Sequence, residues 1–392
     1  MRLKAKIKIP RVLLLVGSMA AVASGCGDSD AGPEGLEDAP AVIENYATIV
    51  HTSYADSVRK AEELKTAIDA FVATPNATTL QAARTAWLAA REPYGQTEVY
   101  RFYDGPIDNP TDGPEGQINA WPLDEVYIDY VDGNATGGII NDPTMFPTLT
   151  KDLLAAQNEQ GGEKNISTGY HAVEFLLWGQ DLNATGPGSR PHTDYVTGAG
   201  GTAANQDRRG QYLKLAAELV IDDLRSVRDA WAPGATNYGA EFQDLDPKEA
   251  LRRILQGMGS LSGAELSGER MTTAYDNRDQ EDEHSCFSDN THQDIYANAL
   301  SIQNVYLGRY GTTDGPGLED LVRARNTELD TKMKQQLEAS IAAVQAIPVP
   351  FDQALVNDDG RAKILAAVRA LQAQTETIVE IATLLGIQIN LE

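Results

Sequence analysis

The chain has 392 residues, of which 42% are hydrophobic and 23% are charged, and these fractions are ordinary for a globular protein. They exclude disorder along the whole chain, and the length predicts two domains or one duplicated fold. Lysine and arginine number 32 against 57 aspartate and glutamate, which gives a formal net charge of −25. Because this charge repels phosphate backbones, we expect no nucleic acid partner.

Residues 1–25 resemble a bacterial secretory signal peptide. A basic stretch precedes an apolar run of about a dozen residues, which is too short to span a bilayer. Small residues then lead into Cys26, as in a lipobox, where a signal peptidase cuts before the cysteine and the cysteine is lipidated. We therefore expect a lipid anchor to the membrane at Cys26, followed by a flexible acidic tether over residues 26–40. The alternative is an ordinary signal peptide with an incidental cysteine.

The residue after the predicted anchor indicates a destination. Gly27 stands where an aspartate would retain a lipoprotein in the inner membrane. We therefore expect an exported bacterial lipoprotein, at the outer membrane or facing the periplasm. If Cys26 carries lipid, Cys286 has no disulfide partner in the chain, because the sequence has two cysteines.

Apolar residues recur every three to four positions along most of the chain, which is the helical period. In chain order, this spacing predicts helices at about residues 41–74, 79–101, 169–178, 212–231, 247–261, 292–309, 317–347 and 359–386. Residues 103–165 are rich in Gly, Pro, Asn and Asp, and so long a segment without periodicity is more often functional than passive. Strand-like alternation is nearly absent. We therefore predict an all-α fold with an N-terminal bundle over 41–240 and a C-terminal bundle over 241–392.

His171 and Glu174 are the first candidate site. Three residues along a helix turn through about 300°, so the two side chains project from one face and can share a ligand. An imidazole beside a carboxylate suits a metal such as iron or zinc. The alternative is a surface pair that stabilises the helix by roughly a few tenths of a kcal/mol. The apolar run at 175–178 argues for burial, and a buried histidine and glutamate need a reason.

Glu281 and His284 repeat this spacing in the reverse order. Glu-x-x-His is the arrangement of carboxylate-bridged iron bundles, so this pair could supply the other half of a metal site. The alternative is a solvated acidic turn. We weigh that alternative lower because Cys286, Phe287 and a second histidine, His292, are poor choices for a solvated surface.

Segments across most of the chain resemble the imelysin family, also called the peptidase M75-like family, and within it the iron-regulated protein A-like subgroup. They are residues 91–98 (REPYGQTE), 101–102, 105–108, 119–125 (NAWPLDE), 169–179 (GYHAVEFLLWG) and 268–295, which includes HSCFSDNTH. The resemblance implies two tandem four-helix-bundle-like domains with a site in the cleft between them. It also implies lipoprotein export and a role in iron acquisition. The family's Gly-x-His-x-x-Glu motif is complete here as Gly169, His171 and Glu174.

These observations lead to one expected function. We expect a lipid-anchored protein that binds iron or an iron-containing compound such as haem, with zinc a poorer candidate, and that passes it to an iron-transport partner protein. The expected metal ligands are His171, Glu174, Glu281 and His284, and the expected cleft-lining residues are Glu98, Arg101, Asp289 and His292.

Two other functions stay open. The family's peptidase label suggests a zinc-type metallopeptidase that uses the same His-x-x-Glu motif. The sequence has neither His-Glu-x-x-His nor His-x-x-Glu-His, and no Gly-x-Ser-x-Gly elbow, so we expect no peptidase activity. Alternatively, the motif joins the two bundles and the cleft binds a non-metal ligand such as a carbohydrate.

Overall fold

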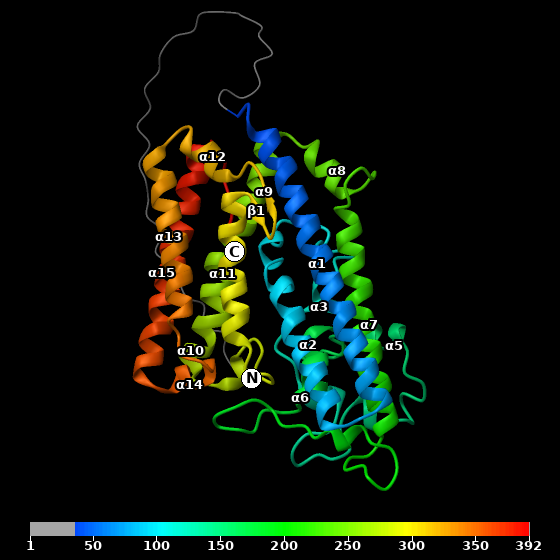
Figure 1. Ribbon diagram of the computed structural model, residues 1–392. Helices are drawn as coiled ribbons and strands as arrows, with labels where there is room; N and C mark the ends of the chain where they lie inside the picture. The colour runs from blue at the N-terminus through cyan, green and yellow to red at the C-terminus, as the bar shows by residue number, and fades with distance from the viewer. Residues whose placement is uncertain (1–35, 392) are drawn as a thin grey trace, which may run out of the picture. The chain divides into compact units, whose positions relative to one another are not determined.

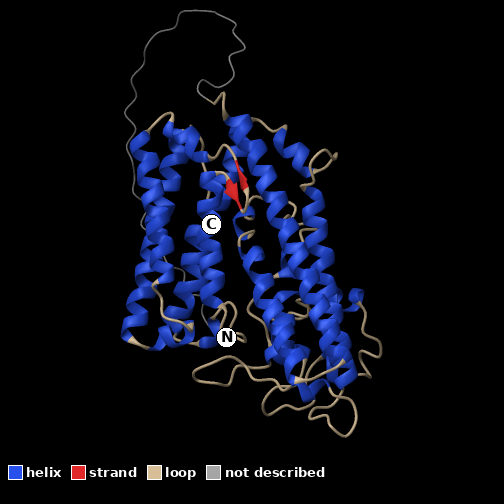
Figure 2. Cartoon of the chain, viewed as in Figure 1, coloured by secondary structure: helices blue, strands red, loops and turns tan. Residues whose placement is uncertain are grey.

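The computed structural model describes residues 36–391, and these residues are helical apart from loops and one two-stranded hairpin (Figure 2). The predicted all-α fold class is confirmed. The predicted signal peptide and Cys26 lie outside the described residues. Within residues 36–391, no helix combines the length and the apolar character that crossing a membrane requires.

The elements differ in type as well as length. Those labelled η are 3-10 helices except η4, which is π-helical. In chain order the elements are α1 (Ala39–Ala73), α2 (Ala77–Gly95), η1 (Glu98–Tyr100), α3 (Glu115–Ile118), α4 (Glu125–Ile128), η2 (Ile139–Asn141), α5 (Lys151–Gln157), α6 (Gly169–Trp178), η3 (His192–Tyr195), α7 (Gln206–Ala230), α8 (Tyr238–Gln243), α9 (Pro247–Ser260), η4 (Leu261–Thr272), α10 (Thr273–Asn277), η5 (Gln280–Asp282), α11 (Thr291–Leu307), β1 (Arg309–Tyr310), β2 (Thr313–Asp314), α12 (Leu318–Arg323), α13 (Thr327–Gln345), α14 (Phe351–Val356) and α15 (Asp358–Leu384).

One group of helices comes from the N-terminal half. The long helix α1 packs against α2 and α7, and α6 packs against α2 and α7 (Figure 1). The turn between α1 and α2 is stabilised by Asn76, whose side chain accepts hydrogen bonds from the backbone N–H groups of Thr78 and Thr79. Residues 103–165 contain only short helices, as the weak periodicity of this segment indicates.

A second group comes from the C-terminal half, where α15 packs against α9, η4, α13 and α14, and α11 packs against α13 and η4. The helix predicted at 317–347 is two helices, because Asn326 caps a new one: its side chain accepts from the backbone N–H of Leu329. The helix predicted at 247–261 continues as the π-helical η4. Stretches of this kind are frequent at functional sites.

The two groups meet where α2 crosses α11. A Cβ added to Gly95 would lie 2.8 Å from the Cβ of Ala297, so glycine allows the close approach. The Asn298 side chain also donates a 2.8 Å hydrogen bond to the carbonyl of Gly95. Residues from Leu36 onward form one compact unit, and the division at residue 240 stays a prediction.

Candidate metal-compound site

Helix α6 carries His171 and Glu174, and both side chains are buried. Nδ1 of His171 lies 2.9 Å from Oε2 of Glu174. The other oxygen of Glu174 accepts hydrogen bonds from the backbone N–H of Ser288 at 3.0 Å and from its hydroxyl at 2.6 Å. Burial raises the pKa of Glu174 to about 8, although the Ser288 hydroxyl stabilises the charged form. Both carboxylate oxygens are therefore engaged inside the protein.

His284 is held in the same way by a different carboxylate. Its Nδ1 lies 2.8 Å from Oδ2 of Asp294, which follows on α11. Asp294 also accepts from Arg91 at 3.1 and 3.3 Å and from the Ser285 hydroxyl. Burial opposes ionisation of Asp294, but the Arg91 guanidinium and His284 hold its pKa well below the ordinary range. Burial and the nearby Arg270 lower the pKa of His284 to about 4.

The two imidazoles lie next to each other at the junction of the helix groups. Their ring centroids are 4.8 Å apart and the ring planes make an angle of 72°. Nε2 of His171 is buried and has no hydrogen-bond partner. Burial and the neighbouring His284 lower the pKa of His171 well below its ordinary value, so the ring is neutral. When Glu174 is ionised it accepts from Nδ1–H, and the lone pair of Nε2 is then available to a ligand.

Glu98 is placed differently from the expectation. It was predicted to line the cleft between the bundles, but it is 1% exposed and lines neither of the cavities described below. Arg270 donates to it at 2.6 Å and Arg101 at 2.9 Å. Burial disfavours its charge, yet these two guanidinium groups lower its pKa to about 2. Glu98 is therefore the buried centre of an ion-pair group.

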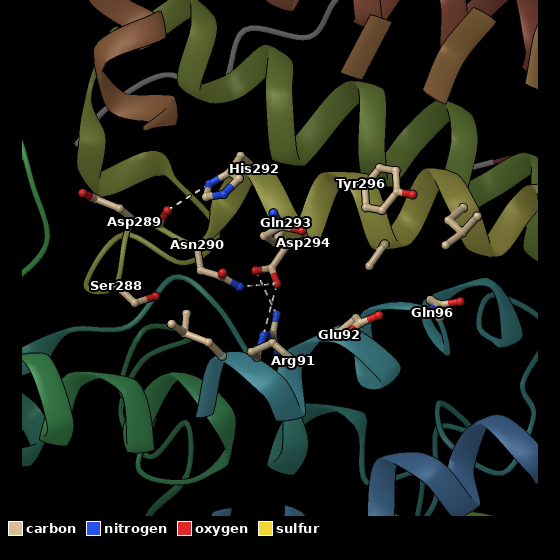
Figure 3. A pocket seen from close by; sticks show the side chains of 13 residues that line it. Arg91, Glu92, Gln96, Ser288, Asp289, Asn290, His292, Gln293, Asp294 and Tyr296 are labelled. Atoms are coloured by element: carbon tan, nitrogen blue, oxygen red, sulfur yellow. Dashed lines mark hydrogen bonds and ion pairs between the residues drawn. The ribbon is translucent and has the colours of Figure 1, made fainter. Parts of the chain in front are cut away.

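Two cavities lie beside residues of this cluster, and His171 lines neither of them. The first, of about 390 Å³, is called here the Trp121 cavity, and its wall includes Arg101, Trp121, Arg270 and His284. The second, of about 400 Å³, is called here the Arg91 cavity and lies between α2 and α11 (Figure 3). Its lining residues are Leu88, Arg91, Glu92, Gln96, Ser288, Asp289, Asn290, His292, Gln293, Asp294, Tyr296, Ala297 and Leu300. Three of the four predicted cleft residues thus line cavities, but not the same one.

Glu281 is not brought to the histidines. It lies in the short 3-10 helix η5 and is exposed, whereas His284 is buried after the helix has ended. The three-residue spacing therefore does not give the two side chains a common helix face. Among residues 36–391, no hydrogen bond or ion pair joins Glu281 to His171, Glu174 or His284. Within the same range, no three His, Cys, Asp or Glu side chains are arranged to hold a metal ion.

The structure adds residues that the sequence did not single out. Arg91, Asp294 and Ser288 hold the two histidines in place, and Asn119 accepts a 2.6 Å hydrogen bond from Arg91. Arg91 sits on α2 among apolar residues, and nothing in its spacing distinguishes a buried arginine from a solvated one. Asp294 and Ser288 lie in the run 284–294, so the proximity of that run to His284 was the available signal.

Comparisons with known proteins agree with this fold. The Imelysin family profile, also named Peptidase_M75, matches residues 50–378. The Iron-regulated protein A of Synechococcus elongatus is 26% identical over 333 residues, which cover 84% of this chain and 82% of that protein. A crystal structure of an iron-regulated protein A precursor from Parabacteroides distasonis is similar, with a TM-score of 0.70, 22% identity and coverage of 92% of this chain and 98% of that chain.

An Imelysin-like protein from Psychrobacter arcticum has a TM-score of 0.64 at 16% identity, covering 90% of this chain and 98% of that one. These two structural likenesses concern the fold, whereas the profile match spans most of the sequence and includes both His171 and His284. The chain belongs to the imelysin family.

Proposed function

We propose that this imelysin binds an iron-containing compound at the His171–His284 pair and serves iron acquisition. The observation that carries the proposal is two buried imidazoles with ring centroids 4.8 Å apart, one of which has an unpartnered Nε2. A metal bonded about 2.1 Å from two imidazole nitrogens, at about 90–110° between the bonds, places the ring centroids about 4.6–5.3 Å apart. The observed separation is therefore suited to two ligands of one metal.

The hydrogen bonds around the rings support the same reading. Histidines that bind metals almost always donate their other ring N–H to a carboxylate or carbonyl, which fixes the ring and raises its basicity. Glu174 occupies that position for His171, and Asp294 occupies it for His284. A relative that is named for iron regulation supports iron as the metal.

The zinc peptidase alternative has less support from the geometry. A catalytic zinc site needs three protein ligands and keeps a fourth position for water. The described part of the chain has no such group of three, and both oxygens of Glu174 are engaged, so Glu174 is not free to act as the base. Export, lipidation at Cys26 and placement at the outer membrane or the periplasm belong to the same proposal. The description of the Parabacteroides relative as a precursor supports export.

The test is to compare binding in three histidine variants. We expect His171→Ala and His284→Ala each to weaken binding of iron compounds by about 10-fold or more, because one of two protein ligands is lost. His51→Ala changes a histidine of α1 outside the site and is the control. Absorbance titration with a panel of ferric complexes and haem measures affinity, and circular dichroism checks the fold. Binding that is unchanged in His171→Ala would place the site elsewhere.

A further inference from the structure

The Trp121 cavity has an acidic wall that the proposed iron site does not use. Its volume of about 390 Å³ lies at the small end of the range for small-molecule sites. Four glutamates from three segments line it: Glu115 on α3, Glu265 on η4, and Glu159 and Glu163 in the loop that follows α5. The cavity therefore has room for a small molecule, and its charge indicates which kind.

The two partly buried glutamates share too few cations. Arg101 pairs with Glu98 at 2.9 Å and with Glu115 at 3.1 Å. Arg270 pairs with Glu98 at 2.6 Å and with Glu265 at 3.0 Å. Two guanidinium groups thus serve three carboxylates, which leaves one negative charge uncompensated. Burial and the neighbouring Glu98 and Glu265 raise the pKa of Glu115, although Arg101 opposes the shift.

Glu159 and Glu163 add two charges to this wall. Both side chains are exposed, and within residues 36–391 neither forms an ion pair. Asn158 ties their loop to α3, because its side chain donates a 2.7 Å hydrogen bond to the carbonyl of Gly116. Oε1 of Glu159 lies 3.7 Å from the position that a Cβ on Gly116 would take, so this carboxylate lies against α3 at the cavity wall. Two carboxylates of the wall thus meet a ligand without competing cations.

The arrangement suits an organic cation better than a metal ion. In the described part of the chain, no three His, Cys, Asp or Glu side chains converge as a metal ion requires. A molecule with several separated charges can meet carboxylates from different segments, which a single ion cannot do. The consecutive residues Ala120, Trp121 and Pro122 also line the cavity and offer apolar surface. Methylene groups between the charges of a ligand are stabilised by packing there.

We propose that the Trp121 cavity binds a linear aliphatic polyamine, at a site separate from the histidines proposed to bind iron. The ammonium groups lie against Glu159, Glu163 and the partly buried carboxylates, and the methylene chain packs on the apolar residues beside them. A triamine such as spermidine carries about three positive charges at neutral pH, because its amines have pKa values near that of lysine. This charge matches the one shared and two unpaired negative charges of the cavity.

Calorimetric titration of the full-length protein with spermidine, n-butylamine and magnesium chloride tests the proposal. We expect one spermidine to bind per chain, at least about 10-fold more tightly than n-butylamine, because more ammonium groups meet carboxylates. Magnesium should bind more weakly than spermidine, since the carboxylates do not converge on one point. The affinity for spermidine should fall as the salt concentration rises, because two of the carboxylates are exposed.

The double variant Glu159→Gln/Glu163→Gln removes the two unpaired charges and should weaken spermidine binding by about 3- to 10-fold. Its matched control, Glu338→Gln/Glu376→Gln, changes two exposed glutamates of α13 and α15 and should bind spermidine as the wild type does. Circular dichroism checks the fold of both variants.

Three outcomes would overturn the polyamine site. They are a wild-type protein that does not bind spermidine, binding of magnesium or n-butylamine as tight as that of spermidine, and equal affinities of the two double variants for spermidine. None of these outcomes bears on the proposed function, which is tested with iron compounds and the histidine variants.

Discussion

At the scale of single residues, Asp294 connects the parts of the site. Its carboxylate holds Nδ1 of His284 and neutralises Arg91, which is 2% exposed. Arg91 in turn donates to Asn119 in the loop that precedes α4. Arg91 lies on α2, Asp294 on α11 and Asn119 in the loop. The buried Arg91–Asp294 pair therefore fixes the relative positions of these three segments. Breaking a buried pair is costly because the partner charge stays buried.

Asp294→Asn should therefore lower the free energy of unfolding by about 3–5 kcal/mol. Urea unfolding followed by circular dichroism measures this loss. Glu380→Gln is the control, because it breaks the exposed pair with Lys332 and should cost less than about 1 kcal/mol. A loss below about 1 kcal/mol in Asp294→Asn would show that the Arg91 charge finds solvent or another partner.

At the scale of elements, the first residue of α6 explains the glycine of the Gly-x-His-x-x-Glu motif. Gly169 has φ +87°, in the left-handed region that favours glycine. A Cβ at this position would lie 2.6 Å from the carbonyl oxygen of Ile118. The glycine therefore allows α6 to begin directly against α3, whose last residue is Ile118, and next to Asn119. This contact positions His171, which follows two residues later on α6.

Gly169→Ala should destabilise the protein by about 2 kcal/mol or more, because backbone strain of about 1–2 kcal/mol adds to the clash with Ile118. Two control variants separate the backbone strain from the clash with Ile118. Gly133→Ala has φ +74° and open space around it, so it reports the backbone strain alone. Gly186→Ala has open space and no positive φ, so it should be nearly neutral. Thermal unfolding compares the three. Equal losses in Gly169→Ala and Gly133→Ala would argue against the close contact.

At the scale of the whole molecule, a small part of the excess of acid is buried without compensating bases. Asp181 and Asp289 are buried near Asp352 and Glu283, and none of the four forms an ion pair within residues 36–391. Burial, together with the neighbouring carboxylates, raises the pKa of Asp181 to about 6 and that of Asp289 to about 7. The Arg91–Asp294 and Arg270–Glu98 pairs have the opposite character, with lowered carboxyl pKa values.

The raised pKa values of Asp181 and Asp289 predict that the free energy of unfolding falls as the pH rises. Between the unfolded pKa of about 4 and the folded values of 6–7, the native state binds more protons than the unfolded chain, so the stabilisation is lost across this window. Asp289→Asn should flatten the decline and add about 1 kcal/mol at pH 8. Asparagine tolerates the positive φ of 56° at this position.

Thermal unfolding between pH 4 and 8 measures the slope, with Asp112→Asn as an exposed control that should change little. A steeper decline in Asp289→Asn than in the wild type would contradict the sign. Below about pH 4 the trend reverses, because Glu98, whose pKa is lowered to about 2, then takes up protons that its arginine partners disfavour.

The sequence by itself determined most of the long helices, the fold class and the first half of the site. Local spacing sets these features: apolar periodicity marks a helix, and a three-residue spacing within α6 joins His171 to Glu174. The break at Asn326 was missed because capping competes with a continuous apolar pattern. The family and the expected role in iron acquisition came from the resemblance to known imelysins.

Only the tertiary structure decided which side chains from the two groups of helices contact each other. His284 pairs with Asp294 rather than with Glu281, because the chain leaves the helical path after η5 and a three-residue spacing then carries no direction. Glu98 is buried because it forms ion pairs with Arg101, which follows η1, and with Arg270 on η4. The apposition of His171 and His284 depends on the packing of α2 and α6 against the segment that leads into α11. Contacts between residues so far apart in the chain depend on how whole helices pack, which local spacing does not encode.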